Sequence, residues 1–289
     1  WANITSSITS EGNYNATFTN TSTVYSRGIK MNARNDSFLS ASVASNKIAT
    51  GSFAFSAWLN LAPGASTRYI YREAPSGKLG NGATNANIGR VISINSSNEL
   101  KFELGYTDNG GAHRRDLYYK DLDLIPNWPG YEKPFHLVVS HTGDMNRTDR
   151  AFFWINGVAV SSLTPSAGTG AAPFTQKPPD EIILLNSQVG GGLTIMGNSA
   201  ASFIDDIVLL KTTASQAAAT ALYNCGTQVS IPSLYGIMTS ASITQYWDFE
   251  SSTLAGTLAS AGSAPLTLTI RNTSAALALA SGSDGAAPI

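Results

Sequence analysis

The stretch FHLVVSHTGDMNRTDRAFFWINGVAV, from Phe135 to Val160, decides the fold class of this chain. Two runs in which apolar residues alternate with other residues flank a polar loop, a pattern typical of paired strands. The second run turns at Asn156-Gly157, the dipeptide that best tolerates the two positive φ angles of a type I′ hairpin. The stretch therefore predicts an antiparallel β meander.

A second stretch, LTIMGNSAASFIDDIVLLKTTASQAAATALYNCG from Leu193 to Gly226, predicts two short strands followed by one helix. Apolar residues recur at helical spacing from Ala214 to Tyr223. Thr213 or Ser215 can cap the start of this helix, and Gly226 suits the left-handed position after its end.

Elsewhere the strand signals are short alternating runs that turn residues separate. So many short strands with a single helix predict a sandwich of two sheets. The predicted strands are Asn15 to Val24, Gly28 to Asn32, Phe53 to Leu61, Val91 to Ile94, Leu100 to Tyr106, Phe135 to Ser140, Ala151 to Ile155, Val158 to Leu163, Glu181 to Leu185, Leu193 to Met196 and Phe203 to Leu210.

Together with SFAFSAWLNL at Ser52 to Leu61, the two long stretches resemble the laminin-G-like or pentraxin-like branch of the concanavalin A-like jelly rolls. The resemblance spans roughly residues 25 to 226. It implies an all-β fold, an antiparallel two-sheet jelly-roll sandwich with one short helix. Because this fold carries lectins, adhesion modules, glycosidases and virion proteins, the resemblance alone does not select a function.

The composition indicates a polar surface that is hardly ionised. Charged residues make up 13% of the 289 residues, against about 25% in an average globular domain. With a net charge of -1, the chain has no field that attracts phosphate backbones, so nucleic acid is not an expected partner. No apolar run approaches the about 20 residues of a membrane helix, so membrane insertion is not expected either.

The C-terminal part predicts strands that follow, rather than precede, the jelly roll. We expect a jelly-roll domain over 1–226, a connection over 227–242 and a strand segment over 243–289. ITQYWDFESSTLAGTLASAGSAPLTLTI, from Ile243 to Ile270, resembles the segment with which a laminin-G-like domain normally begins. It either completes the sandwich of its own chain or contacts a neighbouring subunit, an order that resembles phage and viral structural proteins.

The sequence contains no recognisable catalytic apparatus, and we expect no enzymatic activity. The E-x-D-x-x-E strand of the family's glucanases is absent, as are H-E-x-x-H, G-x-S-x-G and a P-loop. Glu99 and Glu103 share a strand face, but at about 3.3 Å per residue they lie more than about 10 Å apart. An inverting glycosidase pair is closer than that.

Calcium is the one cofactor that the sequence predicts, as a structural ion. The resemblance implies such a site, because relatives of this fold often hold Ca²⁺ with aspartate and asparagine oxygens from their loops. Adjacent aspartates on a regular strand point to opposite faces, so at most one of Asp205 and Asp206 is expected to serve a given ion. The alternative is that these carboxylates cap turns or face solvent. The candidate ligands are Asp205, Asp206, Asp144, Asn146 and Asp149.

A long insertion from Gly105 to Pro134 is the candidate ligand-binding segment. It combines flat aromatic faces with planar guanidinium donors, a mixture that suits a sugar ring or a partner protein. The alternative is a loop that folds over the sandwich edge and buries its aromatic side chains. The candidate ligand-binding residues are His113, Arg114, Arg115, Tyr118, Tyr119, Trp128 and Tyr131.

Three hypotheses about function follow. The first is a non-enzymatic structural subunit of a virion surface, such as a decoration, fibre or spike protein, whose partners are other structural subunits. Its support is the weakly charged surface, the C-terminal segment and a chain that begins at Trp1, as after removal of a leader. The second is a secreted or cell-surface module that binds carbohydrate or mediates adhesion. The third is a glycoside hydrolase with unrecognised carboxylates. The first two locate the protein at a virion surface or outside the cell.

Overall fold

The computed structural model describes residues 16–21, 26–31, 37–43, 48, 50–64, 67–74, 89–144, 150–161, 163–166, 175–176, 179, 181–189, 192–194, 202–225, 242–247, 257–259, 261–272 and 280–281. The described strands form two sheets, which confirms the predicted all-β sandwich. All strand pairs are antiparallel except the pair of β1 with β19.

Sheet A is the nine-stranded sheet. In spatial order its strands are β11 (Val158–Ala159), β10 (Ala151–Ile155), β9 (Pro134–His141), β4 (Phe53–Asn60), β15 (Ser202–Leu210), β2 (Ser26–Met31), β1 (Ala16–Thr21) and β19 (Ala280–Ser281), and β16 (Ile243–Trp247) also pairs with β15.

Sheet B is the ten-stranded sheet. Its strands are β12 (Thr164–Ser166), β8 (His113–Asp121), β7 (Glu99–Thr107), β6 (Arg90–Ile94), β5 (Arg68–Ala74), β13 (Glu181–Val189), β3 (Ser37–Ser42), β18 (Thr267–Asn272) and β17 (Thr257–Ala259), and β14 (Gly192–Thr194) pairs with β13.

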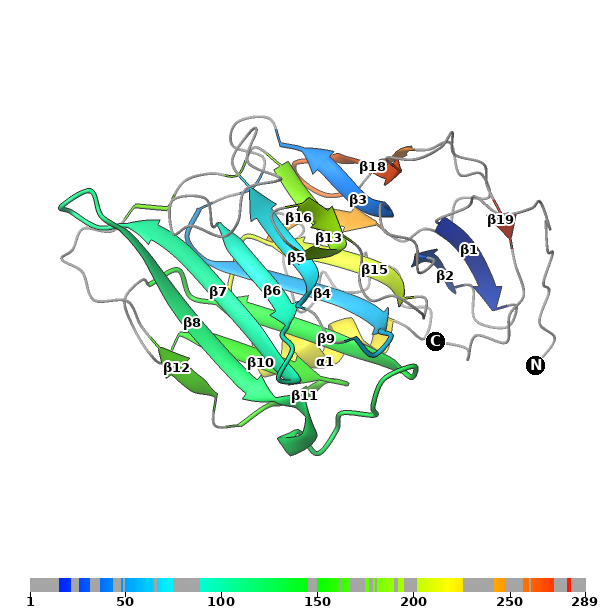
Figure 1. Cartoon of the computed structure of the whole chain (residues 1–289), viewed down its shortest axis with the longest axis horizontal. Helices are drawn as coiled ribbons and strands as arrows, with labels where there is room; N and C mark the ends of the chain where they lie inside the picture. The colour runs from blue at the N-terminus through cyan, green and yellow to red at the C-terminus, as the bar shows by residue number, and fades with distance from the viewer. Residues whose placement is uncertain are drawn as a thin grey trace.

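The main core lies between the two sheets. In Figure 1 the strands β5 to β8 lie across β4, β9 and β10, whereas β1, β2 and β19 lie at the opposite end of the view. Alternation along β4 explains the burial, because Phe53, Phe55, Ala57 and Leu59 all point into this core and are 2% exposed or less. Sheet B contributes Phe102, and its ring stacks 6.4 Å from that of Phe53.

A second, smaller core lies between the outer face of sheet A and the helix α1 (Gln216–Cys225). Small residues such as Ala54 and Ala218 allow the helix to approach the sheet closely. Ser215 Oγ accepts the backbone N–H of Ala218 at 3.1 Å, which makes Ser215 the N-cap. The helix therefore begins two residues later than the apolar pattern indicated.

The hairpin between β10 and β11 has the predicted two-residue turn. Asn156 has φ +51° and Gly157 has φ +74°, as a type I′ turn requires. The Asn156 side chain also accepts the backbone N–H of His136 at 2.8 Å, which ties the turn to β9.

The C-terminal strands pair with both sheets of their own chain. β16 is hydrogen-bonded to β15, and β18 is hydrogen-bonded to β3. Trp247 points into the main core and is 2% exposed, while Tyr246 packs against the second core. Phe249 and the boundary residues 226–241 lie outside the described residues, so the predicted domain limits stay predictions.

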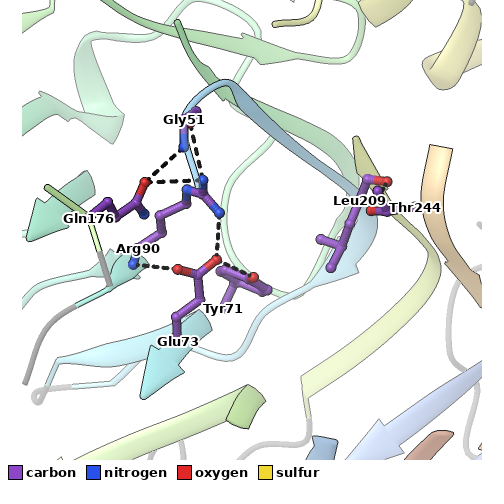
Figure 2. Close-up of polar contacts among 7 residues, drawn as sticks. All are labelled: Gly51, Tyr71, Glu73, Arg90, Gln176, Leu209 and Thr244. Atoms are coloured by element: carbon purple, nitrogen blue, oxygen red, sulfur yellow. Dashed lines mark hydrogen bonds and ion pairs between the residues drawn. The ribbon is translucent and has the colours of Figure 1, made fainter. Parts of the chain in front are cut away.

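A buried polar network closes one end of the core (Figure 2). Glu73 accepts hydrogen bonds from the Arg90 guanidinium at 2.9 Å, the Arg90 backbone N–H at 3.0 Å and the Tyr71 hydroxyl at 2.8 Å. Arg90 also donates to the Gly51 carbonyl at 3.1 Å and lies 4.5 Å from the centre of the Phe53 ring. Burial, followed by the charge of Glu73, raises the pKa of Tyr71, so its hydroxyl remains a donor.

Gly143 lies where the packing beside this polar network leaves no room for a side chain. Its φ is +89°, and a Cβ there would lie 2.6 Å from the backbone of Gly51 and Ser52. Gly111 is a matched control, because its φ is +80° but no atom lies within 4 Å of the same position. Left-handed strain costs about 1 to 2 kcal/mol, and overpacking adds about 1 to 3 kcal/mol. We expect chemical denaturation to show that Gly143→Ala destabilises at least twice as much as Gly111→Ala; equal losses would contradict the contact.

Candidate functional site

The outer face of sheet B, which points away from sheet A, carries the candidate site. Along β7 the residues Leu100, Phe102 and Leu104 point into the core, so the alternate residues point outward. The same alternation along β8 buries Tyr118 in the core. We call the outward-facing set the binding face, and it consists of Tyr69, Lys101, Glu103, His113, Arg115, Leu117 and Tyr119.

Register brings these residues together from three different strands. Lys101 is the direct neighbour of Tyr119 on β8 and of Ser93 on β6, and Ser93 is the neighbour of Tyr69 on β5. With neighbouring strands about 4.8 Å apart, Tyr69 and Tyr119 stand about 14 Å apart at the two ends of one row. Both side chains are half-buried.

A carboxylate at the centre of the binding face orders two cations. Glu103 lies 3.1 Å from Arg115 Nη1 and 3.4 Å from Lys101 Nζ. The Glu103 side chain is 11% exposed, whereas that of Arg115 is 35% exposed. Among the described residues Glu103 is the only hydrogen-bond partner of the Arg115 side chain, which is partly exposed.

The tyrosine at the far end of the row is a hydrogen-bond donor at neutral pH. Burial raises the pKa of Tyr69, which keeps its hydroxyl protonated. The Arg72 guanidinium lies 5.5 Å from the centre of the Tyr69 ring, and burial lowers the pKa of Arg72. The ring is therefore held in place by a neighbouring cation.

Three of the predicted ligand-binding residues share the binding face, namely His113, Arg115 and Tyr119. His113 lies at its end, where its Nδ1 is 3.1 Å from the Thr107 hydroxyl. Arg114 instead donates to Asp108 at 3.0 Å, which ties β8 to its hairpin loop.

The other predicted aromatic residues lie away from this face. Tyr118 is 1% exposed and packs between Phe102 and His141, so it is a core residue. Trp128 packs 4.6 Å from Phe135, and Tyr131 lies 4.6 Å from the guanidinium of Arg68, at the end of the sandwich. The segment predicted as a long loop contains a strand, because β8 runs through it and forms a hairpin with β7. The hairpin loop before β8 and the stretch after it, which includes the 3₁₀ turn η2 (Leu122–Leu124), are irregular.

The sequence did not indicate four residues of the binding face: Tyr69, Lys101, Glu103 and Leu117. Lys101 and Glu103 alternate with apolar residues, which showed that they face away from the core. Nothing in the local pattern showed which strands lie beside β7, and that register is what completes the face.

The structure separates Asp144 from Asp205. Asp205 lies opposite Trp58, whereas Asp144 follows His141, which lies opposite Phe53. Five residues of β4 separate these positions, about 16 Å at 3.3 Å per residue, so we do not expect Asp144 and Asp205 to ligate the same ion. Asp144 is exposed and pairs with Arg150 at 3.4 Å, and Asn146 and Asp149 lie outside the described residues.

The expectation that Asp205 and Asp206 point to opposite faces is wrong. β15 contains a bulge between Asp205 and Val208, and Asp206 has φ +46°. An extra residue in a strand reverses the alternation. Asp205 lies beside Trp58 on the outer face, and Asp206 accepts the hydroxyl of Tyr246 from the same face at 3.1 Å. In the part of the chain that the structure describes, no three acidic, histidine or cysteine side chains form a metal-binding group. Structural calcium stays a prediction.

No protein-family model and no curated protein sequence matches this chain. Among solved structures it is similar to a candidate carbohydrate-binding protein of Bacteroides ovatus, with 12% identity, a TM-score of 0.46 and coverage of 85% of this chain and 61% of the other. The serotype G botulinum neurotoxin binding domain gives 14% identity, a TM-score of 0.45 and coverage of 74% and 47%. Botulinum neurotoxin type C, whose cell entry depends upon interaction with two ganglioside molecules, gives 16% identity, a TM-score of 0.42 and coverage of 73% of this chain and 47% of the other.

At these identities and TM-scores the similarities assign neither a function nor site residues to the chain, which spans only about half the length of these proteins. The laminin-G-like resemblance and the likeness to viral structural proteins have no family model in their support. None of the helices among the described residues is long and apolar enough to cross a membrane.

Proposed function

We propose that this chain is a non-enzymatic glycan-binding module and that the binding face of sheet B holds the glycan. The observation that carries the proposal is the partly exposed Arg115 guanidinium, which an ion pair with Glu103 orders on the same sheet face as the half-buried Tyr69 and Tyr119. Sugar rings present hydroxyls to such donors and apolar C–H faces to aromatic rings.

Preorganisation supports this use of the face. A side chain that is already ordered by an ion pair loses less freedom when a ligand binds. Arg115 is ordered by Glu103, and Tyr69 is ordered by Arg72. A rigid module whose role is only structural does not require ordered donors at its surface, and for this reason we favour glycan binding over the virion-subunit hypothesis.

The carboxylates of sheet B support a binding role rather than hydrolysis. Glu103 is engaged by two cations and lies four residues from Glu99 on the same strand. Glu99 lies directly opposite Asp121, but each accepts a local hydrogen bond, from the Asn95 amide at 2.6 Å and from the Asp123 backbone N–H at 2.9 Å. A general acid needs a raised pKa and a free proton. We therefore propose that the module acts without turnover, at an extracellular or virion surface.

A glycan array compared between three forms of the protein tests the proposal. We expect the wild type to bind a defined set of glycans and the Arg115→Ala/Tyr119→Ala variant to lose at least 20-fold in affinity, about 1.8 kcal/mol. Lys211→Ala is the matched control, because Lys211 is an exposed cation just after β15 of sheet A. Equal loss in the control, or unchanged binding in the double variant, would exclude the binding face as the site.

A further inference from the structure

Arg68 is a buried cation that the binding face does not use. It begins β5, points inward at the end of the sandwich and is 1% exposed. Its Nη1 donates to the Ala62 carbonyl at 2.7 Å and its Nη2 to the Tyr131 hydroxyl at 2.6 Å. Its Nε has no partner, and among the described residues no carboxylate pairs with it. A buried charge without an opposite charge is unfavourable.

The unused group lies on the edge of the guanidinium that best fits a carboxylate. The N–H bonds of Nε and Nη2 run parallel from one edge, and the two oxygens of a carboxylate match that spacing. In this structure the Nε half of the edge has no partner, and the Nη2 half is covered by the Tyr131 hydroxyl.

Tyr131 covers Arg68 from a segment with an unusual backbone. Gly130 before it has φ +97°, and Glu132 after it has φ +60°. A positive φ is unfavourable for a residue such as glutamate and persists only where other contacts hold it. Those contacts include the Tyr131 hydroxyl, which donates to Asn98, whose own amide donates to the exposed Asp123 at 3.0 Å.

We propose that Arg68 is a carboxylate-binding site and that Tyr131 is its displaceable cover. A ligand carboxylate replaces the Tyr131 hydroxyl, engages Nε and Nη2 together and supplies the negative charge that the buried guanidinium lacks. Trp128 is half-buried, and its ring centre lies 5.5 Å from that of Tyr131, so a ligand that displaces Tyr131 meets the apolar ring of Trp128. A carboxylate carried on a ring, as in a sugar acid, fits both the Arg68 guanidinium and the Trp128 ring.

This site is separate from the binding face and does not rest on it. It lies at the end of the sandwich, where Asn98 precedes β7 and Tyr131 precedes β9. The two sites can therefore be distinguished by the arginine that responds to a ligand, Arg68 or Arg115.

The Nε–H signals of arginine in ¹H–¹⁵N NMR spectra test the proposal directly. Glucuronate is the probe, and glucose is its neutral control. We expect saturable glucuronate binding to move the Arg68 Nε–H signal downfield, while glucose leaves it unchanged. The signal that disappears in Arg68→Met is thereby assigned to Arg68, and this variant should no longer respond to glucuronate.

Tyr131→Phe provides a second measurement that does not depend on how Arg68→Met folds. Because phenylalanine cannot occupy the Nη2 edge or donate to Asn98, we expect at least five-fold tighter glucuronate binding in this variant. An Arg68 signal that glucuronate moves in neither wild type nor Tyr131→Phe would overturn the proposal. Movement of the Arg115 signal alone would also overturn it, while supporting the binding face.

Discussion

We expect Glu73→Leu to lower the free energy of unfolding by about 3 to 5 kcal/mol, because it removes the carboxylate that pairs with the buried Arg90 guanidinium. Arg90 is 1% exposed and Glu73 is fully buried, so solvent cannot replace the lost partner. The substitution also removes the acceptor of the Tyr71 hydroxyl. Urea denaturation at constant pH measures the change.

The double variant Glu73→Leu/Arg90→Met is the control for this first prediction. Replacing both members of a buried ion pair with apolar residues of similar size removes the unpaired charge, and such replacements are often neutral. We expect the double variant to be more stable than Glu73→Leu alone. If the single variant loses less than about 1 kcal/mol, or if the double variant loses more than the single one, the network in Figure 2 does not stabilise the fold as described.

The second large effect is a loss of stability in mild acid. Burial lowers the pKa of His136 to about 3, and burial together with Arg90 and Arg150 lowers the pKa of His141 to about 3. The unfolded chain binds these protons near pH 6.5. Between those values the unfolded state binds more protons than the folded state, so stability falls as the pH falls. From pH 7 to pH 5 each histidine contributes a loss of about 2 kcal/mol.

Thermal unfolding of wild type and His141→Phe between pH 7.5 and pH 5 checks this second prediction. Phenylalanine keeps the contacts with Phe102 and Tyr118 but cannot take up a proton. We expect the variant to lose about 2 kcal/mol less than wild type over this range, whatever its stability at pH 7.5. Parallel pH profiles for the two proteins would show that His141 does not carry the effect.

The sequence predicted the sandwich because several strands alternate in a simple way. β4, β9 and β10 place apolar residues on the core side at every second position. β5 was missed because two of its inward residues, Arg68 and Glu73, are charged, and their burial depends on partners far away in the sequence. β8 was missed for a related reason, since its inward Asp116 is buried with the Tyr106 hydroxyl as donor.

The site was harder to predict than the fold. The composition of the Gly105 to Pro134 segment pointed to Arg115 and Tyr119, but not to Glu103, which fixes the guanidinium. That contact depends on the register between β7 and β8, and the row to Tyr69 depends on two further pairings. The bulge at Asp206 could not be predicted for a similar reason. One extra residue changes which side of the sheet the following side chains face, yet the local sequence pattern resembles that of an ordinary strand.

A crystal structure of the chain with the glycan that binds most tightly on an array tests the central proposal most directly. We expect a sugar ring against Tyr119, with at least one hydroxyl or carboxylate oxygen within hydrogen-bond distance of the Arg115 guanidinium and Glu103 still paired with Arg115. A glycan bound elsewhere on the chain, with Arg115 and Tyr119 free of contact, would contradict it.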